Sequence, residues 1–431
     1  MSIISTKAPV SHQKLSGDYW KFWTGQTISN TGSVFTRFIL PLLVYKLTGS
    51  ALALGLTAAA VYLPYLLVGL VIGALVDRMN RKRIMIITDL ARAVVIASIP
   101  LLYQLGLLSM GWIYTVAFIQ TTLGIFFESC EFAAIPSLVN TDELLTANGR
   151  IQASYSVGRI CGPLLAGLLL FILPVPAVLL GDSVSFLISA FSLMLVRRSF
   201  NSDDEPVAQK SIGTKGYVKD LYRDIAEGLS YIFKHPVLRN ISIMMALVNF
   251  AFCPIYTQIV FFAKQQFQMD NAQIGWFFVA SSVGVIVFSL ATAWVRKRWS
   301  FGIVALSTLM LMGATITIFA LIHVYWIELP LWAIIFGLST LYNINDMSLR
   351  QAVVPNEMLG RVITVENVIS WSVIPLGTLL GGWLIQVTNS IVLVYAVCGI
   401  LMVLAAGAFF FTALAHAERY LPEAKPTSQA G

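Results

Sequence analysis

Long apolar runs separated by short polar stretches make up most of the chain. A helix needs about 20 apolar residues to cross a bilayer, so each run predicts one membrane-spanning helix. Twelve such spans are expected, at residues 20–45, 51–76, 84–105, 110–134, 148–172, 175–196, 237–262, 272–295, 301–323, 327–350, 360–386 and 390–414. The pattern therefore predicts an all-α membrane protein.

The densest polar stretch, residues 73–83, separates the second span from the third and reads GALVDRMNRKR. Its cations and its carboxylate cannot enter the bilayer core cheaply, so it is expected to form a short aqueous loop. If both termini are cytoplasmic, the basic residues outside the spans gather on the cytoplasmic side, and the outer loops hold only Lys46 and Lys264. This asymmetry predicts a multi-pass protein of the cell (inner) membrane with both termini inside.

Composition narrows the function classes. Hydrophobic residues make up 57% of the chain and charged residues 11%, which leaves too little polar surface for a soluble protein. The net charge of +7 comes from basic residues at span ends, so nucleic-acid binding is not expected. The sequence has no phosphate-loop motif, which disfavours ATP as the energy source, and no nucleophile motif or histidine cluster that would suggest an enzyme, a cofactor or a metal site.

Residues 197–236 form the only long connection between spans. Over 217–233, apolar residues recur at helical spacing opposite charged ones, which predicts an amphipathic helix along the inner membrane surface. The expected domains are a six-helix bundle at 1–196, this central loop, a second six-helix bundle at 237–415 and a cytoplasmic tail at 416–431.

An internal repeat supports two matching halves. The motif GPLLAG, which starts at Gly162, recurs as GTLLGG at Gly377, 215 residues later. Parallel repeats occur in transporters whose two bundles are related by a pseudo-two-fold axis, and their substrate site lies at the interface of the repeats.

Two motifs resemble signatures of the major facilitator superfamily, and the likeness extends over essentially the whole chain. The 73–83 loop is similar to the family's loop between helices 2 and 3, with Asn80 where glycine is usual; asparagine tolerates the positive φ of a tight turn. The fifth span resembles the antiporter signature of drug/proton exchangers, and residues 25–50 look like the branch of macrolide efflux proteins and the enterobactin exporter. The matching positions are Gly73, Asp77, Arg78, Arg81 and Lys82 in the loop, and Gly158, Arg159, Gly162, Pro163 and Gly167 in the fifth span.

The resemblance implies the major facilitator fold, with twelve transmembrane helices in two six-helix bundles, and a gate at the loop. It implies that Asp77 contacts the positive N-terminal end of the eleventh helix, near Arg361, when the cytoplasmic side is shut. Such a contact is a latch. Alternatively the cations of the loop only set the topology, and the two roles are compatible.

The small residues of the fifth span permit close helix packing, and Pro163 permits a bend. One interpretation is a tight, leak-proof seam between the halves; the other is ordinary small-residue packing. Arg159 falls near the bilayer midplane, where it must face a cavity or a buried acid.

Two carboxylates, Glu128 and Asp346, lie on helices that line the cavity in the resembled fold. A buried carboxylate can take up and release a proton as its surroundings change, so both are candidates for proton coupling. The alternative is that they join Glu131, Arg350 and Glu366 in ion pairs of the inner gate.

Arg37, in the outer half of the first span, has no obvious local partner, so it could attract an anionic substrate group or pair with Asp182. Polar side chains on lining helices could contact a bulky amphipathic solute or bond between helices. The candidates for the substrate cavity are Arg37, Asn30, Gln120, Asn249 and Asn343.

Together these features predict a secondary active transporter that exchanges protons for an amphipathic small molecule, such as a macrolide-like drug or a siderophore, by alternating access. Within transport, the alternative is uptake, or movement of a lipid or anionic solute bound by Arg37 and Arg159. The alternative of another class is a membrane sensor or enzyme on a transporter scaffold.

Overall fold

The computed structural model of the chain describes residues 15–76, 79–140, 143–200, 223 and 226–420, and the regular structure of these residues is entirely helical. The first half contains α1 (Gly17–Thr48), α2 (Ala51–Leu67), α3 (Gly69–Val76), α4 (Arg81–Gln104), α5 (Met110–Leu138), α6 (Leu144–Ile172) and α7 (Val175–Leu195). The second half contains α9 (Pro236–Thr257), α10 (Ile259–Phe267), α11 (Asn271–Arg296), α12 (Phe301–Leu321), α13 (Tyr325–Val353), α14 (Asn356–Thr388), α15 (Ile391–Phe409) and the 3₁₀ helix η2 (Ala413–Tyr420).

Two of the predicted spans are each built from two consecutive helices. α2 gives way to α3 four residues after Pro64, and α9 gives way to α10 four residues after Pro254. Each proline lacks a backbone N–H, and its ring clashes with the turn before it, so it weakens the last turns of the first helix of each pair. With each pair taken as one segment, the helices follow the twelve predicted runs. In the described part of the chain, nine helices are long and apolar enough to cross a membrane.

Serine residues set the starts of several helices. Ser16, Ser50, Ser109, Ser300 and Ser390 each accept a hydrogen bond from the backbone N–H three residues further on. Each thereby satisfies one of the N–H groups that a helix start leaves without a partner, an interaction worth about 1 kcal/mol. The polar residues between apolar runs therefore determine where the runs become helices.

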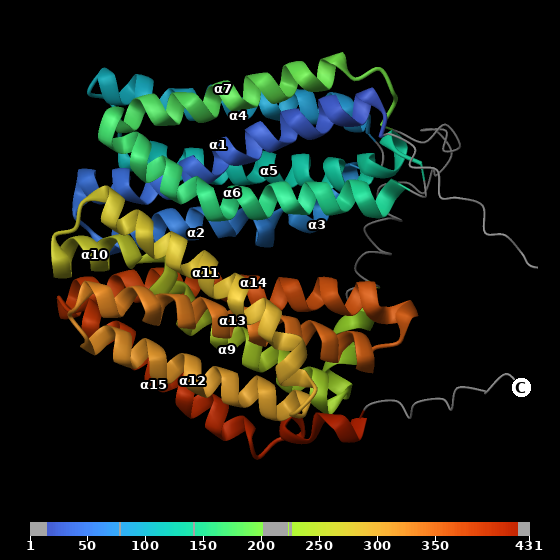
Figure 1. The fold of residues 1–431 in the computed structure, drawn as a ribbon, viewed down its shortest axis with the longest axis vertical. Coiled ribbons are helices and arrows are strands. Elements are labelled where there is room, and N and C mark those ends of the chain that lie inside the picture. The colour runs from blue at the N-terminus through green and yellow to red at the C-terminus, as the bar shows by residue number, and fades with distance from the viewer. Residues whose placement is uncertain (1–14, 77–78, 141–142, 201–222, 224–225, 421–431) are drawn as a thin grey trace, which may run out of the picture.

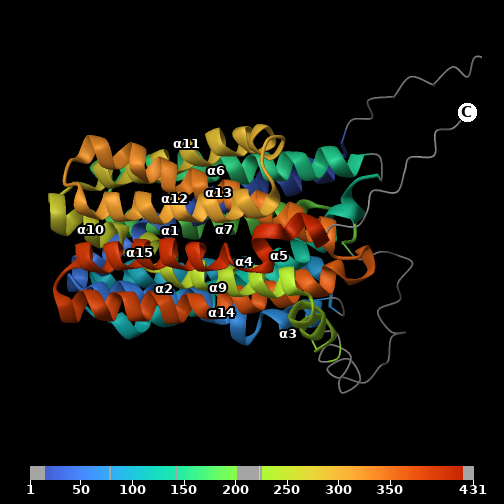
Figure 2. The ribbon, with the colours of Figure 1, turned by 90° about the horizontal axis from the view of Figure 1, so that it is seen from below.

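The helices form two bundles that lie side by side, α1–α7 in one and α9–α15 in the other (Figure 1). Their long axes run in roughly the same direction, so the molecule has two ends (Figure 2). One end carries the starts of α1, α4 and α9 and is termed the basic end, because Arg81, Lys82 and Arg83 open α4 there. The other is termed the opposite end and carries α10 and the turn between α1 and α2.

Backbones of the two bundles touch near the opposite end, where α2 meets α14. A Cβ atom added to Gly55 of α2 would lie 2.6 Å from the carbonyl oxygen of Thr378, and one added to Gly382 of α14 would lie 2.7 Å from that of Ala51. The side-chain amide of Gln258 donates a 2.8 Å hydrogen bond to the same Ala51 oxygen. There is no room for a side chain at Gly55 or Gly382, so the two backbones meet directly at this seam.

The repeated glycines serve corresponding contacts in the two bundles. A Cβ atom on Gly162 of α6 would lie 2.9 Å from Cβ of Val34 in α1. One on Gly377 of α14 would lie 2.5 Å from the carbonyl oxygen of Phe250 in α9. In each half, the glycine of the repeat thus lets the fifth segment approach the first segment of that half.

The central connection contains a helical stretch at residues 226–234, after α7 ends at Leu195 and before α9 begins at Pro236. Of the amphipathic helix expected at 217–233, residues 217–222 and 224–225 lie outside the described part of the chain.

Candidate functional site

The faces through which the two bundles meet carry aromatic and charged side chains. Tyr65 of α2 packs edge to face on Trp371 of α14, with ring centroids 5.1 Å apart. Glu128 of α5 and Arg37 of α1 are both exposed, and both lie within electrostatic range of Tyr65. These two candidates therefore flank the space between the bundles.

Three of the polar cavity candidates bond within their own bundle. Gln120 exchanges hydrogen bonds with Arg92, from its amide to the Arg92 carbonyl oxygen at 3.1 Å and from the guanidinium to its amide oxygen at 3.3 Å. The amide of Asn249 donates to the carbonyl oxygen of Ser370 at 3.0 Å, and that of Asn343 donates to Ser339 one turn earlier. Asn343 is exposed, while Gln120 and Asn249 are half-buried.

Asn30, the remaining polar candidate, faces the glycine motif. A Cβ atom on Gly158 of α6 would lie 3.5 Å from the amide nitrogen of Asn30. Gly158 and Gly162 thus both face α1, so this part of the motif packs inside the first bundle. The side chains of Arg159 and Pro163 lie outside the described part of the structure, and α6 is helical through both positions.

A buried charge cluster occupies the first bundle. The guanidinium of Arg92 lies 3.9 Å from the fully buried carboxylate of Asp89, as its spacing on α4 predicts. It also lies over the ring of Phe186 at 4.1 Å and donates to the hydroxyl of Ser33 at 3.3 Å. Arg92 is thereby fixed by contacts with three other helices of its bundle.

Asp182 belongs to the same interior but has its own partners. Its carboxylate accepts hydrogen bonds from the hydroxyls of Thr36 and Ser185. Arg37 instead donates to the carbonyl oxygen of Ser33 at 3.4 Å and forms no ion pair with any carboxylate of the described residues. Of the two roles expected for Arg37, pairing with Asp182 is therefore not made in this arrangement.

A second buried cluster lies in the other bundle, towards the basic end of α13. Arg350 pairs with Asp346 at 2.7 Å and with Glu366 of α14 at 2.8 Å. The other oxygen of Glu366 accepts from the hydroxyl of Ser242 in α9 at 2.8 Å. All three charged side chains are at most 5% exposed. Two carboxylates thus share one guanidinium inside one bundle. The ion pairs expected among Asp346, Arg350 and Glu366 are formed, and all three residues belong to the second bundle.

The basic loop is fastened to its own bundle. The guanidinium of Arg81 donates to the carbonyl oxygens of Ala133 at 3.2 Å and Phe200 at 3.3 Å, and Lys82 donates to that of Val196 at 2.6 Å. These contacts join the start of α4 to the ends of α5 and α7.

The remaining latch residues are only partly described. Gly73 lies in α3 and Arg361 in α14, but nothing is described of their side chains, and Asp77 and Arg78 lie outside the described residues. The prediction that Asn80 forms a tight turn with positive φ was wrong, because its φ is −72°. It is the N-cap of α4, where its side chain accepts from the N–H of Arg83 at 3.0 Å. Asparagine suits this position because it caps helices.

Sequence reasoning missed one buried acid. Glu328, in the first turn of α13, is 0% exposed, and neither carboxylate oxygen has a hydrogen-bond partner among the described residues. A single acidic residue inside an apolar run is the signal that could have found it. Among the described residues, no group of His, Cys, Asp and Glu could hold a metal ion.

Two helical bundles that lie side by side, each with a buried charge cluster, are the architecture of a multi-pass membrane transporter. The chain belongs to the Major Facilitator Superfamily, whose family model matches residues 22–377. This membership places the protein among transporters of small molecules and not among enzymes.

Comparisons with known proteins agree with this assignment. The chain is 25% identical over 366 residues to the multidrug efflux pump Tap of Mycolicibacterium fortuitum, covering 82% of this chain and 86% of that protein. It is 24% identical to macrolide efflux protein A of Streptococcus pyogenes, covering 84% and 88%. Among solved structures, the nucleoside transporter NupG matches with a TM-score of 0.73 at 13% identity, over 94% of this chain and 100% of that one. A bacterial homologue of ferroportin in an inward-facing state matches with a TM-score of 0.71 at 14% identity, over 92% and 99%.

Proposed function

We propose that this protein is a proton-coupled antiporter that exports an amphipathic small molecule, of the macrolide or siderophore kind, by alternating access. The observation that carries the coupling is the pair Asp346 and Glu366, which share the single guanidinium of Arg350 in a buried cluster. One guanidinium neutralises only one of the two carboxylates, and burying the second negative charge costs free energy. Protonation of one carboxylate removes that cost. The names of the similar efflux proteins support export and the substrate class.

The basic end is the cytoplasmic end in this proposal, because positively charged loops stay on that side. The backbone seam between α2 and α14 closes the opposite, outer end, so the present arrangement faces inward. In the outward-facing arrangement the basic end closes, and Asp77 then meets the start of α14 near Arg361. In this proposal the latch belongs to the outward-facing state.

Proton exchange follows from the geometry of the cluster. When Glu366 takes up a proton, Arg350 keeps only Asp346, on its own helix, as an ionic partner, and the contact between α13 and α14 weakens. Release of the proton restores the double contact. Because α14 also forms the outer seam, protonation at one end of the helix biases closure at the other. Glu128, exposed between the bundles, is the second coupling candidate.

The test uses inverted membrane vesicles with an imposed proton gradient and a panel of amphipathic drugs. We expect Asp346→Asn and Glu366→Gln to abolish gradient-driven accumulation and to spare counterflow, which needs no net proton movement. The matched control is Glu143→Gln, because the carboxylate of Glu143 accepts hydrogen bonds from the backbone N–H and the side-chain amide of Asn140 and lies outside the cluster. Driven transport at the wild-type rate in both cluster variants would remove them as coupling sites, and Glu128→Gln then becomes the variant to test.

The exposed guanidinium of Arg37 favours a second candidate, transport of a lipid or anionic solute, in either direction. If Arg37→Gln abolishes movement of anionic solutes and leaves neutral and cationic amphiphiles unaffected, this candidate replaces the first. Arg159 would then be its expected partner at the midplane.

A further inference from the structure

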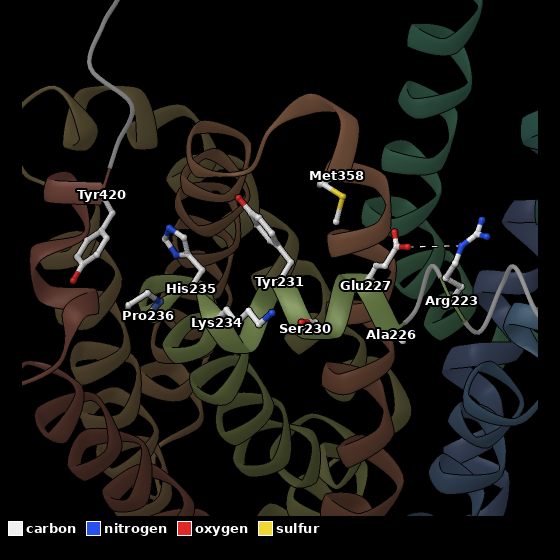
Figure 3. A pocket seen from close by; sticks show the side chains of 10 residues that line it. All are labelled: Arg223, Ala226, Glu227, Ser230, Tyr231, Lys234, His235, Pro236, Met358 and Tyr420. Carbon is white, nitrogen blue, oxygen red and sulfur yellow. Dashed lines mark ion pairs between the residues drawn. The ribbon is translucent and has the colours of Figure 1, made fainter.

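A pocket of about 730 Å³ opens at the basic end, lined by the second half of the chain and the segment before it. Its walls come from the helical stretch 226–234, the first turns of α9 and α14 and the end of η2 (Figure 3). The transport proposal does not use this pocket. It lies where three helices of the second bundle meet the connection between the halves.

Three rings form one wall of the pocket. Tyr231 stacks on His235 with centroids 6.4 Å apart, and His235 meets Tyr420 edge on at 5.8 Å (Figure 3). The ring of His235 also caps α9 by accepting from the N–H of Leu238 at 3.5 Å. Burial lowers the pKa of His235 below its usual 6.5, so its ring is neutral at pH 7 and adds no charge to the pocket.

The positive charge of the pocket comes from lysine. Lys234 lines it, is exposed and forms no ion pair with the described residues. Arg223, the other lining cation, pairs with Glu227 at 3.7 Å. Lys234 is therefore the cation available to a ligand.

The pocket lies at the level where membrane spans begin. Pro236 and Met358 belong to the first turns of α9 and α14. The 226–234 stretch buries Ile232 in the core while Leu229 and Phe233 stay 39% and 50% exposed. An amphipathic helix of this kind lies in the membrane interface with its apolar side in the lipid. The pocket thus lies at the depth of lipid headgroups.

We propose that this pocket binds the headgroup of an anionic phospholipid. Lys234 pairs with the phosphate, the three-ring wall packs on the glycerol, and Met358 and Pro236 contact the first carbons of the acyl chains. Basic pockets beside membrane helices are suited to such headgroups. A bound lipid joins the 226–234 stretch to the first turn of α14, and so stabilises the arrangement of helices described above.

The experiment measures the thermal unfolding midpoint of the purified full-length protein in detergent during titration with phosphatidylglycerol or with phosphatidylcholine of the same acyl chains. We expect phosphatidylglycerol to raise the unfolding midpoint more than phosphatidylcholine does. Lys234→Gln should weaken its apparent affinity about fivefold, since a lysine near an anionic lipid contributes on the order of a fivefold factor. Lys297→Gln removes an exposed cation at the same end outside the pocket and should leave the affinity unchanged.

A second variant, Met358→Glu, places a carboxylate inside the pocket and should remove most of the phosphatidylglycerol effect. The proposal is overturned if Lys234→Gln keeps the wild-type affinity for phosphatidylglycerol. It is also overturned if Lys297→Gln lowers that affinity as much as Lys234→Gln does, because binding would then depend on the overall surface charge. It is also overturned if inorganic phosphate gives the same stabilisation, because the ligand would then be a free anion.

Discussion

Arg350 determines the charge balance of the second bundle. It joins two helices by contacting Asp346 on its own helix and Glu366 on the next. A buried ion pair adds little net stability, yet removal of one partner is costly because the other charges stay buried. The substitution of this one residue therefore has a larger effect than that of either acid.

Arg350→Gln is expected to destabilise the protein by about 3–5 kcal/mol, since it leaves two buried carboxylates without their cation. The double variant Arg350→Gln/Glu366→Gln should recover part of the loss, because it removes one of those carboxylates. Thermal unfolding of the purified variants measures both effects. A double variant no more stable than the single one would contradict the shared role of Arg350.

The sequence was informative about these residues only in part. Asp346 was predicted as a candidate because it is a carboxylate inside an apolar run, on a helix that lines the cavity in the resembled fold. Its grouping with Arg350 and Glu366 was expected only as the alternative, in ion pairs of the inner gate. Which acids share Arg350 depends on how α13, α14 and α9 pack, and no short-range pattern records that.

At the scale of elements, α2 and α14 depend on glycine at their crossing. Gly382 could be recognised because the motif that contains it repeats that of α6. Gly55 could not be recognised from the sequence, because it stands alone in a run of alanine and leucine. Glycine is required there only because the backbone of the other bundle approaches it. The helices were predictable from local apolar pattern, whereas their points of closest approach were not.

Gly55→Val is expected to open the seam, because its side chain would overlap the Thr378 carbonyl group. Overpacking of this kind costs about 1–3 kcal/mol, which lowers the population of the sealed arrangement about 5- to 150-fold. A cysteine at position 258, where Gln258 is fully buried, should then react faster with an impermeant maleimide added from the outside. Gly181→Val, at a position where an added Cβ meets nothing within 4 Å, should leave the labelling rate unchanged.

At the scale of the whole molecule, the proposed mechanism places two gates, one at each end, on the same helix. The first part of α14 is the expected partner of the Asp77 latch, and its later part forms the seam with α2. A rigid helix shared by both gates cannot easily close both at once.

The fold class and the matching halves were predictable from sequence, because span length, loop charge and the repeat are all local features of the sequence. The state of the gates was not, because both states use the same sequence.

Asp77→Asn is expected to slow driven transport about 5- to 30-fold, since the latch contact is worth about 1–2 kcal/mol in the outward-facing state. Asp77→Glu keeps the charge and should retain most of the rate. Transport in inverted vesicles under a proton gradient measures both. Equal rates in the wild type and Asp77→Asn would leave the loop with its topological role alone.

The glycine seam has an electrical consequence. Its contacts involve Gly55, Thr378, Gly382, Ala51 and Gln258, none of which has an ionisable side chain. A membrane voltage falls mainly across the part of a protein that water does not enter. Moving one elementary charge through a drop of 100 mV changes its free energy by about 2.3 kcal/mol. In the proposed antiport, a proton that reaches the second-bundle cluster from the basic end while the seam is closed would cross little of that voltage. The transition that opens the seam would then carry the charge of the cluster across the voltage drop, and the membrane potential would act on that step.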